Sequence, residues 1–500
     1  MAAATKSFYR SRGRRSGRHR SSDGIVTAVN FDKMYSTIVS TPTLTESLAS
    51  YWTAARFEDL PADTVRLAKR FLIDTLAAGI AGAHTDVAEA VLAAAQAATE
   101  GAGGSATVWG RTEKLPAPMA AMVNGTSAHA LELDDFGGCG HSGAVVIPAL
   151  CALAGRVEFS GKQALSALVA GYDLAARTLE GAGGYRPVTD LGWHSTGICG
   201  SFGAAAVSGK LLGLDRERFA DALGIAGTFT GGIWAFLADG AMTKRFHPGN
   251  ASENGLSAAL LAQAGMSGPR MVLEAQWGGF FSTYAKDVAT PGATLAGLGT
   301  EFRIARSGMK PYACCRGLHA CQDALFELMR ELGIGSGQIA AMVVHGNEQV
   351  RVQFDRIEIG NMLDAQFSMQ YALAAGATSG RGTLDQFTTP RTAEPEVQRL
   401  MRSTRVVADR VLKPGEYPAL ELVLADGRRV ERHIKFAKGA PENPLSEAEL
   451  HAKVASLVEP VLGPAACTEL LDRVAVLESV GDFRDLIRLL VPDARTQKVA

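Results

Sequence analysis

The sequence lacks any apolar run that approaches the roughly 18 residues needed to span a bilayer, so we expect no membrane partner. An excess of charge is also absent, because 50 Lys and Arg residues nearly balance 51 Asp and Glu residues. Such a chain has no overall field that attracts nucleic acid, so a local cluster must hold any anionic ligand. Aromatic residues make up only 7% of the chain, which disfavours a β-sandwich or a β-barrel.

Cysteine is scarce, with only seven among the 500 residues, and the number is odd. A long chain with few, unpaired cysteines is typical of free thiols in a reducing compartment. The composition therefore predicts a cytoplasmic protein.

Basic residues dominate the N-terminal segment. Six arginines fall between Arg10 and Arg20, and no acidic residue precedes Asp23. A secretory signal needs an apolar stretch after such charges, and none follows. We interpret residues 1–43 as a basic disordered tail. The alternatives are a mitochondrial transit peptide, translation from Met34, and a nucleic-acid-binding arm, which nothing downstream supports.

Helical patterns fill the first half of the chain. Thr43 followed by Glu46 is a capping-box pattern, which predicts that a helix begins at residue 44. Residues 116–276 are rich in Ala, Gly and Leu and are almost entirely helical in pattern. The small residues of segment 197–213 predict a buried central helix that approaches its neighbours closely.

The pattern changes after about residue 305. Residues 339–344 and 419–423 are short β-type runs, and Asp426-Gly427 predicts a hairpin turn after the second run. Residues 441–490 return to a helical pattern. We therefore expect a mainly α fold with an inserted α+β lid: a large all-helical domain built from both chain ends, residues 44–305 and 441–490, and a smaller α+β domain at 306–440.

A first polar cluster combines Glu132, Asp134 and Asp135 with His141. Carboxylates beside a histidine suit acid–base chemistry or metal binding. The alternative is the end of a helix, with solvated carboxylates and a Gly-rich turn.

A second candidate is His194, which stands directly before the small-residue helix. The backbone N–H groups at a helix N-terminus stabilise a bound anion, and they disfavour a protonated imidazole. We therefore predict that His194 stays neutral and acts as a base. The alternative is a capping or packing role.

Three basic groups, Lys244, Arg245 and His247, form a third cluster in an Ala/Gly-rich neighbourhood. Arginine grips a carboxylate in a bidentate way and lysine supplies a point charge, so the cluster predicts an anion cradle. The alternative is a basic surface turn.

A fourth cluster runs from Lys310 through the adjacent pair Cys314-Cys315 to His319. Adjacent cysteines are poor structural zinc ligands, and no second ligand pair follows, so we predict no metal site here. We interpret the segment as a loop that supplies Lys310 and the Cys315 thiol. Further on, the phenol of Tyr371 is either a proton donor or a packed core side chain.

Taken in order, these segments resemble the MmgE/PrpD family over about residues 44–490. The resemblance implies a cofactor-free lyase, usually a homodimer, with a pocket between a helical domain and an α+β lid. It also implies the residues that act there. The positions that match the family's motifs are His141, His194, Lys244, His247, Lys310 and Tyr371.

The sequence departs from common family patterns in three places, one of which is the segment before His141, shorter here than in several members. Gly137 stands where many members have a second histidine, and Cys315 stands where one decarboxylating branch has a histidine. A Tyr-Ala-Cys-Cys segment and a Gly-Trp-His segment are similar to those of other decarboxylating members.

The resemblance implies chemistry at the carbon next to a carboxylate. Our hypothesis is that His141 and His194 transfer protons and that Lys244 and Lys310 hold substrate carboxylates. Further substrate-binding candidates are His247, Arg245, Cys315 and the carboxylates Glu132 and Asp135, which we expect to orient His141. Tyr371 completes the catalytic candidates as a donor.

The expected reaction is dehydration or hydration of a citrate-like acid, as in 2-methylcitrate dehydration. The alternatives are cis-aconitate-type decarboxylation, epimerisation of an amino or imino dicarboxylate, and a non-catalytic carboxylate-binding protein. We expect no metal and no organic cofactor.

Overall fold

Helices make up most of the chain that the computed structural model describes, namely residues 41–387, 390–413 and 415–492. The predicted basic tail lies almost entirely outside these residues. From Pro42 on, the described residues form one compact unit.

The first half of this unit is helical, as predicted. Thr43 accepts a hydrogen bond from the backbone N–H of Glu46, and Glu46 accepts one from Thr43, which confirms the expected capping box. The principal helices here are α2 (Leu44–Ala54), α3 (Ala62–Gly82), α4 (Asp86–Ala98), α5 (Ala117–His129), α6 (Gly143–Leu153), α7 (Gly161–Gly181), α9 (Ser195–Leu211), α10 (Arg216–Ala226) and α11 (Thr243–Gln263). Two short helices, α8 (Tyr185–Asp190) and α12 (Phe280–Tyr284), join them.

Helix α9 is the buried central helix that its small residues predicted. A Cβ atom added at Gly203 would lie 2.7 Å from the carbonyl oxygen of Gly171 in α7, and one at Gly200 would lie 3.1 Å from the Cβ of Ala251 in α11. Glycine therefore lets α7 and α11 pack against α9 almost backbone to backbone. This close packing fixes the N-terminus of α9, where His194 is the N-cap residue.

The α+β region contains a four-stranded sheet of order β6-β5-β7-β8. The strands are β5 (Ile339–Gly346), β6 (Thr404–Ala408), β7 (Ala419–Leu424) and β8 (Arg429–Arg432). The predicted strands at 339–344 and 419–423 and the hairpin at Gly427, which has φ +87°, are confirmed. Strand β6, parallel to β5, was not predicted. The helices of this region are α13 (His319–Leu332), α14 (Glu348–Phe354), α15 (Met362–Gln366), α16 (Met369–Ser379) and α17 (Pro395–Ser403).

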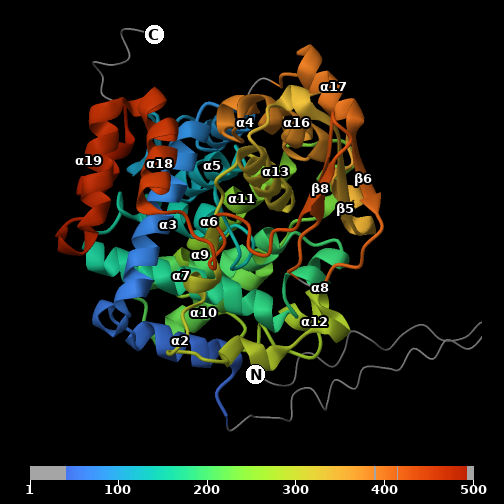
Figure 1. Ribbon diagram of the computed structural model, residues 1–500. Helices are drawn as coiled ribbons and strands as arrows, with labels where there is room; N and C mark the ends of the chain where they lie inside the picture. The colour runs from blue at the N-terminus through green and yellow to red at the C-terminus, as the bar shows by residue number, and fades with distance from the viewer. Residues whose placement is uncertain (1–40, 388–389, 414, 493–500) are drawn as a thin grey trace, which may run out of the picture. The chain divides into compact units, whose positions relative to one another are not determined.

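The C-terminal helices return to the helical part. Helices α18 (Glu447–Leu462) and α19 (Pro464–Ala475) pack on α3, and Figure 1 shows them in red beside the blue of that helix. Arg70 of α3 forms an ion pair with Glu447 of α18. The large helical part is thus built from both chain ends, with a smaller α+β region between them. The exact boundaries at 305/306 and 440/441 stay predictions.

A short strand pair connects the two regions beside the polar clusters. Strand β3 (Asp135–Phe136) pairs antiparallel with β4 (Gly308–Met309). The pairing places Lys310, the residue after β4, next to the acidic segment that contains β3. Along the described chain, no helix combines the length and apolar character needed to cross a membrane.

Candidate active site

A cavity of about 470 Å³ collects most of the predicted charged residues. The helical part contributes Glu132, His141, His194 and Lys244 to its lining, and the segment after β4 contributes Lys310 and Cys315. Glu132, Lys244 and Lys310 are at most 2% exposed, so they lie at the innermost end of the cavity.

Glu132 lies between the two lysines. Helix α5 ends at His129, and Glu132 then adopts a left-handed φ of +55°, a strained conformation that recurs at functional sites. Its carboxylate accepts hydrogen bonds from Lys244 Nζ and, at 2.9 Å, from Lys310 Nζ. Burial opposes ionisation of Glu132, but the charges of Lys244 and Lys310 outweigh it and hold its pKa well below 4.5. The ionised Glu132 therefore holds the ammonium groups of both lysines together at the cavity.

The two lysines differ in their electrostatics. Burial lowers the pKa of Lys244, although Glu132 opposes this effect. For Lys310, the charges of Glu132 and Asp134 overcome burial and raise the pKa. Lys310 Nζ lies 3.7 Å from the nearer Asp134 oxygen, so it faces two carboxylates where Lys244 faces one. Lys310 is thus the more firmly protonated member of the pair.

Asp134 holds two imidazoles. Nδ1 of His129 lies 3.0 Å from both carboxylate oxygens of Asp134, and Nδ1 of His141 lies 2.9 Å from Oδ2. The carbonyl oxygen of Asp135 also lies 2.9 Å from His141 Nδ1. His141 therefore directs its Nδ1 at the acidic segment, and Nε2 is the ring nitrogen available to a substrate.

His129 is a site residue that the sequence analysis missed. Its ring is fully buried and lies 4.1 Å from that of His141, centroid to centroid. Burial lowers the pKa of His129 to about 3. The only sequence signal was its position one turn before the acidic cluster, at the end of a helix that contains no charged residue.

Asp135 was predicted to bind substrate, but its carboxylate instead binds the backbone at the start of α6. Its carboxylate accepts hydrogen bonds from the backbone N–H of Gly143, at 3.0 and 3.1 Å, at the first residue of α6. Burial and the neighbouring Asp134 raise the pKa of Asp135 well above 3.8. The side chain fixes the start of α6 and is not among the residues that line the cavity.

His194 and His247 face each other, with their Nδ1 atoms 2.9 Å apart. Burial, followed by the charge of Lys244, lowers the pKa of His194 well below 6.5. The predicted neutral imidazole is therefore supported, but burial and Lys244 are the main causes. The rings of His194 and His141 lie 6.0 Å apart, so both histidines border the same space. His247 contacts His194 through this Nδ1 pair and does not itself line the cavity.

Two predicted residues point away from the cavity. Arg245 donates a 2.8 Å hydrogen bond to the side-chain oxygen of Gln366, so it braces the wall instead of holding an anion. The Tyr371 hydroxyl donates to the carbonyl of Gln386 at 2.5 Å and accepts from the backbone N–H of Arg391 at 2.9 Å. Neither is a lining residue, and the packed alternative for Tyr371 fits the structure.

A different tyrosine reaches the cavity. Tyr185, at the start of α8, is 47% exposed but lines the cavity together with Cys315. Burial of its hydroxyl end, with contributions from Cys315 and Glu132, raises the pKa of Tyr185 to about 12. A protonated phenol at this place can donate a hydrogen bond to a substrate oxygen. Its only signal in the sequence is the Gly-Gly pair directly before the residue.

His129, Asp134 and His141 have ligand-type atoms within 4.8 Å of one another, which is the spacing of a metal site. The Nδ1 atoms of both histidines are already directed at Asp134, and the Lys310 ammonium lies 3.7 Å from the same carboxylate. A nearby ammonium opposes a divalent cation and favours an anion. The donor set fits acid–base chemistry better than metal binding.

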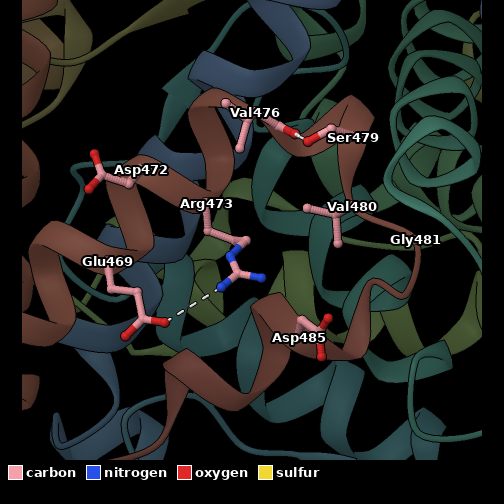
Figure 2. A pocket seen from close by; sticks show the side chains of 8 residues that line it. All are labelled: Glu469, Asp472, Arg473, Val476, Ser479, Val480, Gly481 and Asp485. Carbon is pink, nitrogen blue, oxygen red and sulfur yellow. Dashed lines mark hydrogen bonds and ion pairs between the residues drawn. The ribbon is translucent and has the colours of Figure 1, made fainter.

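A second hollow, of about 480 Å³, lies at the C-terminal helices (Figure 2). Arg473 forms an ion pair with Glu469 at 3.6 Å, and Asp472 and Asp485 also line it. Neither an imidazole nor a lysine is among its described lining residues, so it offers no counterpart to the acid–base groups of the first cavity.

Comparison with known proteins finds matches over most of the chain. The MmgE/PrpD N-terminal domain matches residues 46–290, and the MmgE/PrpD C-terminal domain matches residues 312–478. The chain belongs to the MmgE/PrpD family. Members that resemble it include a cis-aconitate decarboxylase-like protein of Aspergillus oryzae, 30% identical over 90% of this chain and 98% of that protein. The human cis-aconitate decarboxylase is 27% identical over 89% of this chain and 94% of its own, and that of Aspergillus terreus is 27% identical over 87% and 93%.

Proposed function

We propose that the protein is a carboxy-lyase that removes carbon dioxide from an unsaturated tricarboxylate of the cis-aconitate type. The observation that carries the proposal is the meeting of Lys244 and Lys310 at Glu132, in a cavity that His141 and His194 also line. Relatives named as cis-aconitate decarboxylases support decarboxylation ahead of the dehydration that the sequence analysis placed first.

The reaction needs one proton and a place for transient negative charge. The bond between a methylene carbon and its carboxylate breaks, and the electron pair forms a new double bond to the central carbon. The old double bond shifts its electrons onto the neighbouring carbon, which takes up a proton. Lys244 and Lys310 stabilise the charge that builds on the adjoining carboxylate, because they are buried where electrostatic interactions are strong.

We assign delivery of the proton to Nε2 of His141. Asp134 accepts from Nδ1 of the same ring at 2.9 Å and stabilises the charged imidazole. His194, which burial keeps neutral, donates a hydrogen bond from its Nε2–H to a substrate carboxylate; its ring lies 6.0 Å from that of His141. Tyr185 supplies a further donor at the wall.

The test is to incubate the purified protein with cis-aconitate, 2-methylcitrate and citrate. We expect carbon dioxide from cis-aconitate, and loss of that signal in the His141→Gln variant. If double-bond absorbance grows with 2-methylcitrate and no carbon dioxide is released, the protein is a dehydratase and the proposed decarboxylation is wrong. Thermal stabilisation by all three acids without turnover would instead identify a non-catalytic carboxylate-binding protein.

A further inference from the structure

The cavity is larger than a small tricarboxylate requires. Its volume of about 470 Å³ corresponds to roughly fifteen water molecules at about 30 Å³ each. A six-carbon tricarboxylate has about twelve non-hydrogen atoms, each of which takes up less room than a water molecule. Such a substrate leaves a substantial part of the cavity unfilled.

The unfilled part has a distinct chemical character. The acid–base residues come from the helical part and from the segment after β4, whereas the outer wall comes from α14 and residues 412–418. That wall contributes the apolar or aromatic side chains of Val350, Phe354, Leu412, Tyr417 and Pro418, with the polar side chains of Gln349, Gln353 and Glu416 among them. Most of the surface that bounds the cavity is apolar.

The outer wall offers no cation to a carboxylate. Among the lining residues of α14 and of residues 412, 413 and 415–418, the only charged side chain is Glu416, and there is neither a lysine nor an arginine. Arg186, which also lines the cavity, belongs to α8. Arg316, at the edge of this wall, donates to the carbonyls of Ala437 and Lys438 and lies over the Phe136 ring at 4.1 Å. A carboxylate placed against the wall would face the Glu416 carboxylate and no positive charge, and it would lose part of its hydration, which is costly.

An alkyl chain is the ligand group that this wall accommodates. Burying a methylene group in apolar surroundings improves affinity about fourfold. Phe354 and Phe367 stack with ring centroids 6.4 Å apart, and a Cβ at Gly317 would lie 2.4 Å from the Phe354 ring. Glycine at 317 thus lets the Phe354 ring lie flat against the backbone, which keeps this side of the cavity open.

We propose that the substrate is a cis-aconitate-type acid that carries an alkyl side chain of several carbons, with its carboxylates at Lys244 and Lys310 and its chain against the wall of α14 and 412–418. This inference rests on the proposed decarboxylase function for the reaction, but not for the binding preference.

The first experiment measures binding without turnover. Calorimetry compares succinate with hexylsuccinate, a saturated dicarboxylate that cannot undergo the reaction. We expect hexylsuccinate to bind at least tenfold more tightly. Equal affinity of the two probes would overturn the inference, whatever the protein does with cis-aconitate.

The second experiment measures turnover. We expect kcat/KM for carbon dioxide release to rise from cis-aconitate to its butyl- and hexyl-substituted analogues, by up to about fourfold per methylene that reaches the wall. A constant or falling kcat/KM along the series overturns the inference and leaves the decarboxylase in place. Tight hexylsuccinate binding with no carbon dioxide from any aconitate overturns the proposed reaction and leaves the binding preference in place.

A matched pair of variants locates the wall. Val350 lines the cavity, whereas Val352 on the same helix is 69% exposed and is not a lining residue. Val350→Phe should lower the ratio of hexylsuccinate to succinate affinity at least fivefold, and Val352→Phe should leave it unchanged. Leu412→Phe, on the other segment of the wall, gives a second test if Val350→Phe fails to fold. An unchanged ratio in folded variants of both lining residues contradicts the placement.

Discussion

Nδ1 of His141 lies 2.9 Å from Oδ2 of Asp134. The two residues come from the same segment between α5 and α6, so the geometry depends on the backbone path through the glycines at 137, 138 and 140, all with positive φ. The carboxylate fixes which nitrogen of His141 carries the proton, and it offsets the positive charge of the ring during proton transfer.

Asp134→Asn should therefore lower kcat roughly 10²–10⁴-fold, because the amide neither holds the correct tautomer nor balances the imidazolium. Steady-state decarboxylation assays measure this effect, and KM should change little since the lysines remain. Circular dichroism serves as the folding control. A variant with nearly normal kcat would contradict the role assigned to the pair.

His129 positions Asp134 from the side away from the cavity. His129→Leu removes one of the two imidazoles at that carboxylate and should lower kcat at least about tenfold, because a misplaced catalytic group is costly even at small displacements. His129→Asn keeps an N–H donor near the Nδ1 position and should restore part of kcat. Equal kcat values in the two variants would indicate that the ring contributes packing alone.

The contrast between Tyr371 and Tyr185 gives a third test. Tyr371→Phe should leave kcat/KM unchanged and lower the free energy of unfolding by about 1–3 kcal/mol, because the backbone groups of Gln386 and Arg391 lose their partner. Tyr185→Phe removes the donor at the cavity wall and should lower kcat/KM without loss of stability. Chemical denaturation measures the stability of both variants, and decarboxylation assays measure their kcat/KM. A loss of kcat/KM in Tyr371→Phe but not in Tyr185→Phe would identify Tyr371 as the catalytic phenol.

Stability should fall in mild acid because burial lowers the pKa of His247, as it does those of His129 and His194. Burial and then Lys244 lower the folded pKa of His247 from 6.5 to about 4. Below pH 6.5 the unfolded chain binds a proton at this histidine that the folded protein does not, so the free energy of unfolding decreases as the pH falls from 6.5 toward 4. Urea denaturation between pH 7 and pH 4 measures the decrease.

His247→Asn should make that pH dependence shallower. His433→Asn, at an exposed histidine, is the matched control and should leave the slope as in the unchanged protein. Identical slopes in the two variants would exclude His247 as a source of the acid sensitivity.

Lys453 connects a C-terminal helix to the acidic segment. Its ammonium donates to Asp74 of α3 at 2.5 Å and to the carbonyl of Leu133 at 2.6 Å. Lys453→Met should destabilise the fold by about 3–5 kcal/mol, because it leaves the buried Asp74 carboxylate unpaired. Adding Asp74→Leu should recover much of that loss. Urea denaturation of the single and double variants measures both changes, and no recovery would show that the contact with Leu133 dominates.

The sequence predicted elements whose causes are local. The capping box at Thr43 and Glu46 and the turn at Gly427 depend on residues within four positions of each other, and both are confirmed. Strand β6 was missed because its partner β5 lies about sixty residues earlier in the chain, so no local pattern announces the pairing.

The candidate site shows the same division. Clusters of charge in Ala/Gly-rich surroundings marked Glu132, Lys244 and Lys310, which the fold brings together from three distant segments. The direction of a side chain depends on its tertiary neighbours. That is why Tyr371 and Arg245 bear the right groups for chemistry yet turn away from the cavity, and why His129 was overlooked.

The two halves of the cavity wall come from different stretches of the chain, and this has an evolutionary consequence. Substitutions in α14 or in residues 412–418 can alter which acids enter without moving His141, Asp134 or the lysines, since those residues are fixed by α5, α6, α11 and the β3–β4 pair. Related enzymes can thus diverge in substrate preference while they keep the same reaction. Among related proteins, differences in substrate preference should therefore appear as substitutions in α14 and in the segment that contains Leu412 and Tyr417.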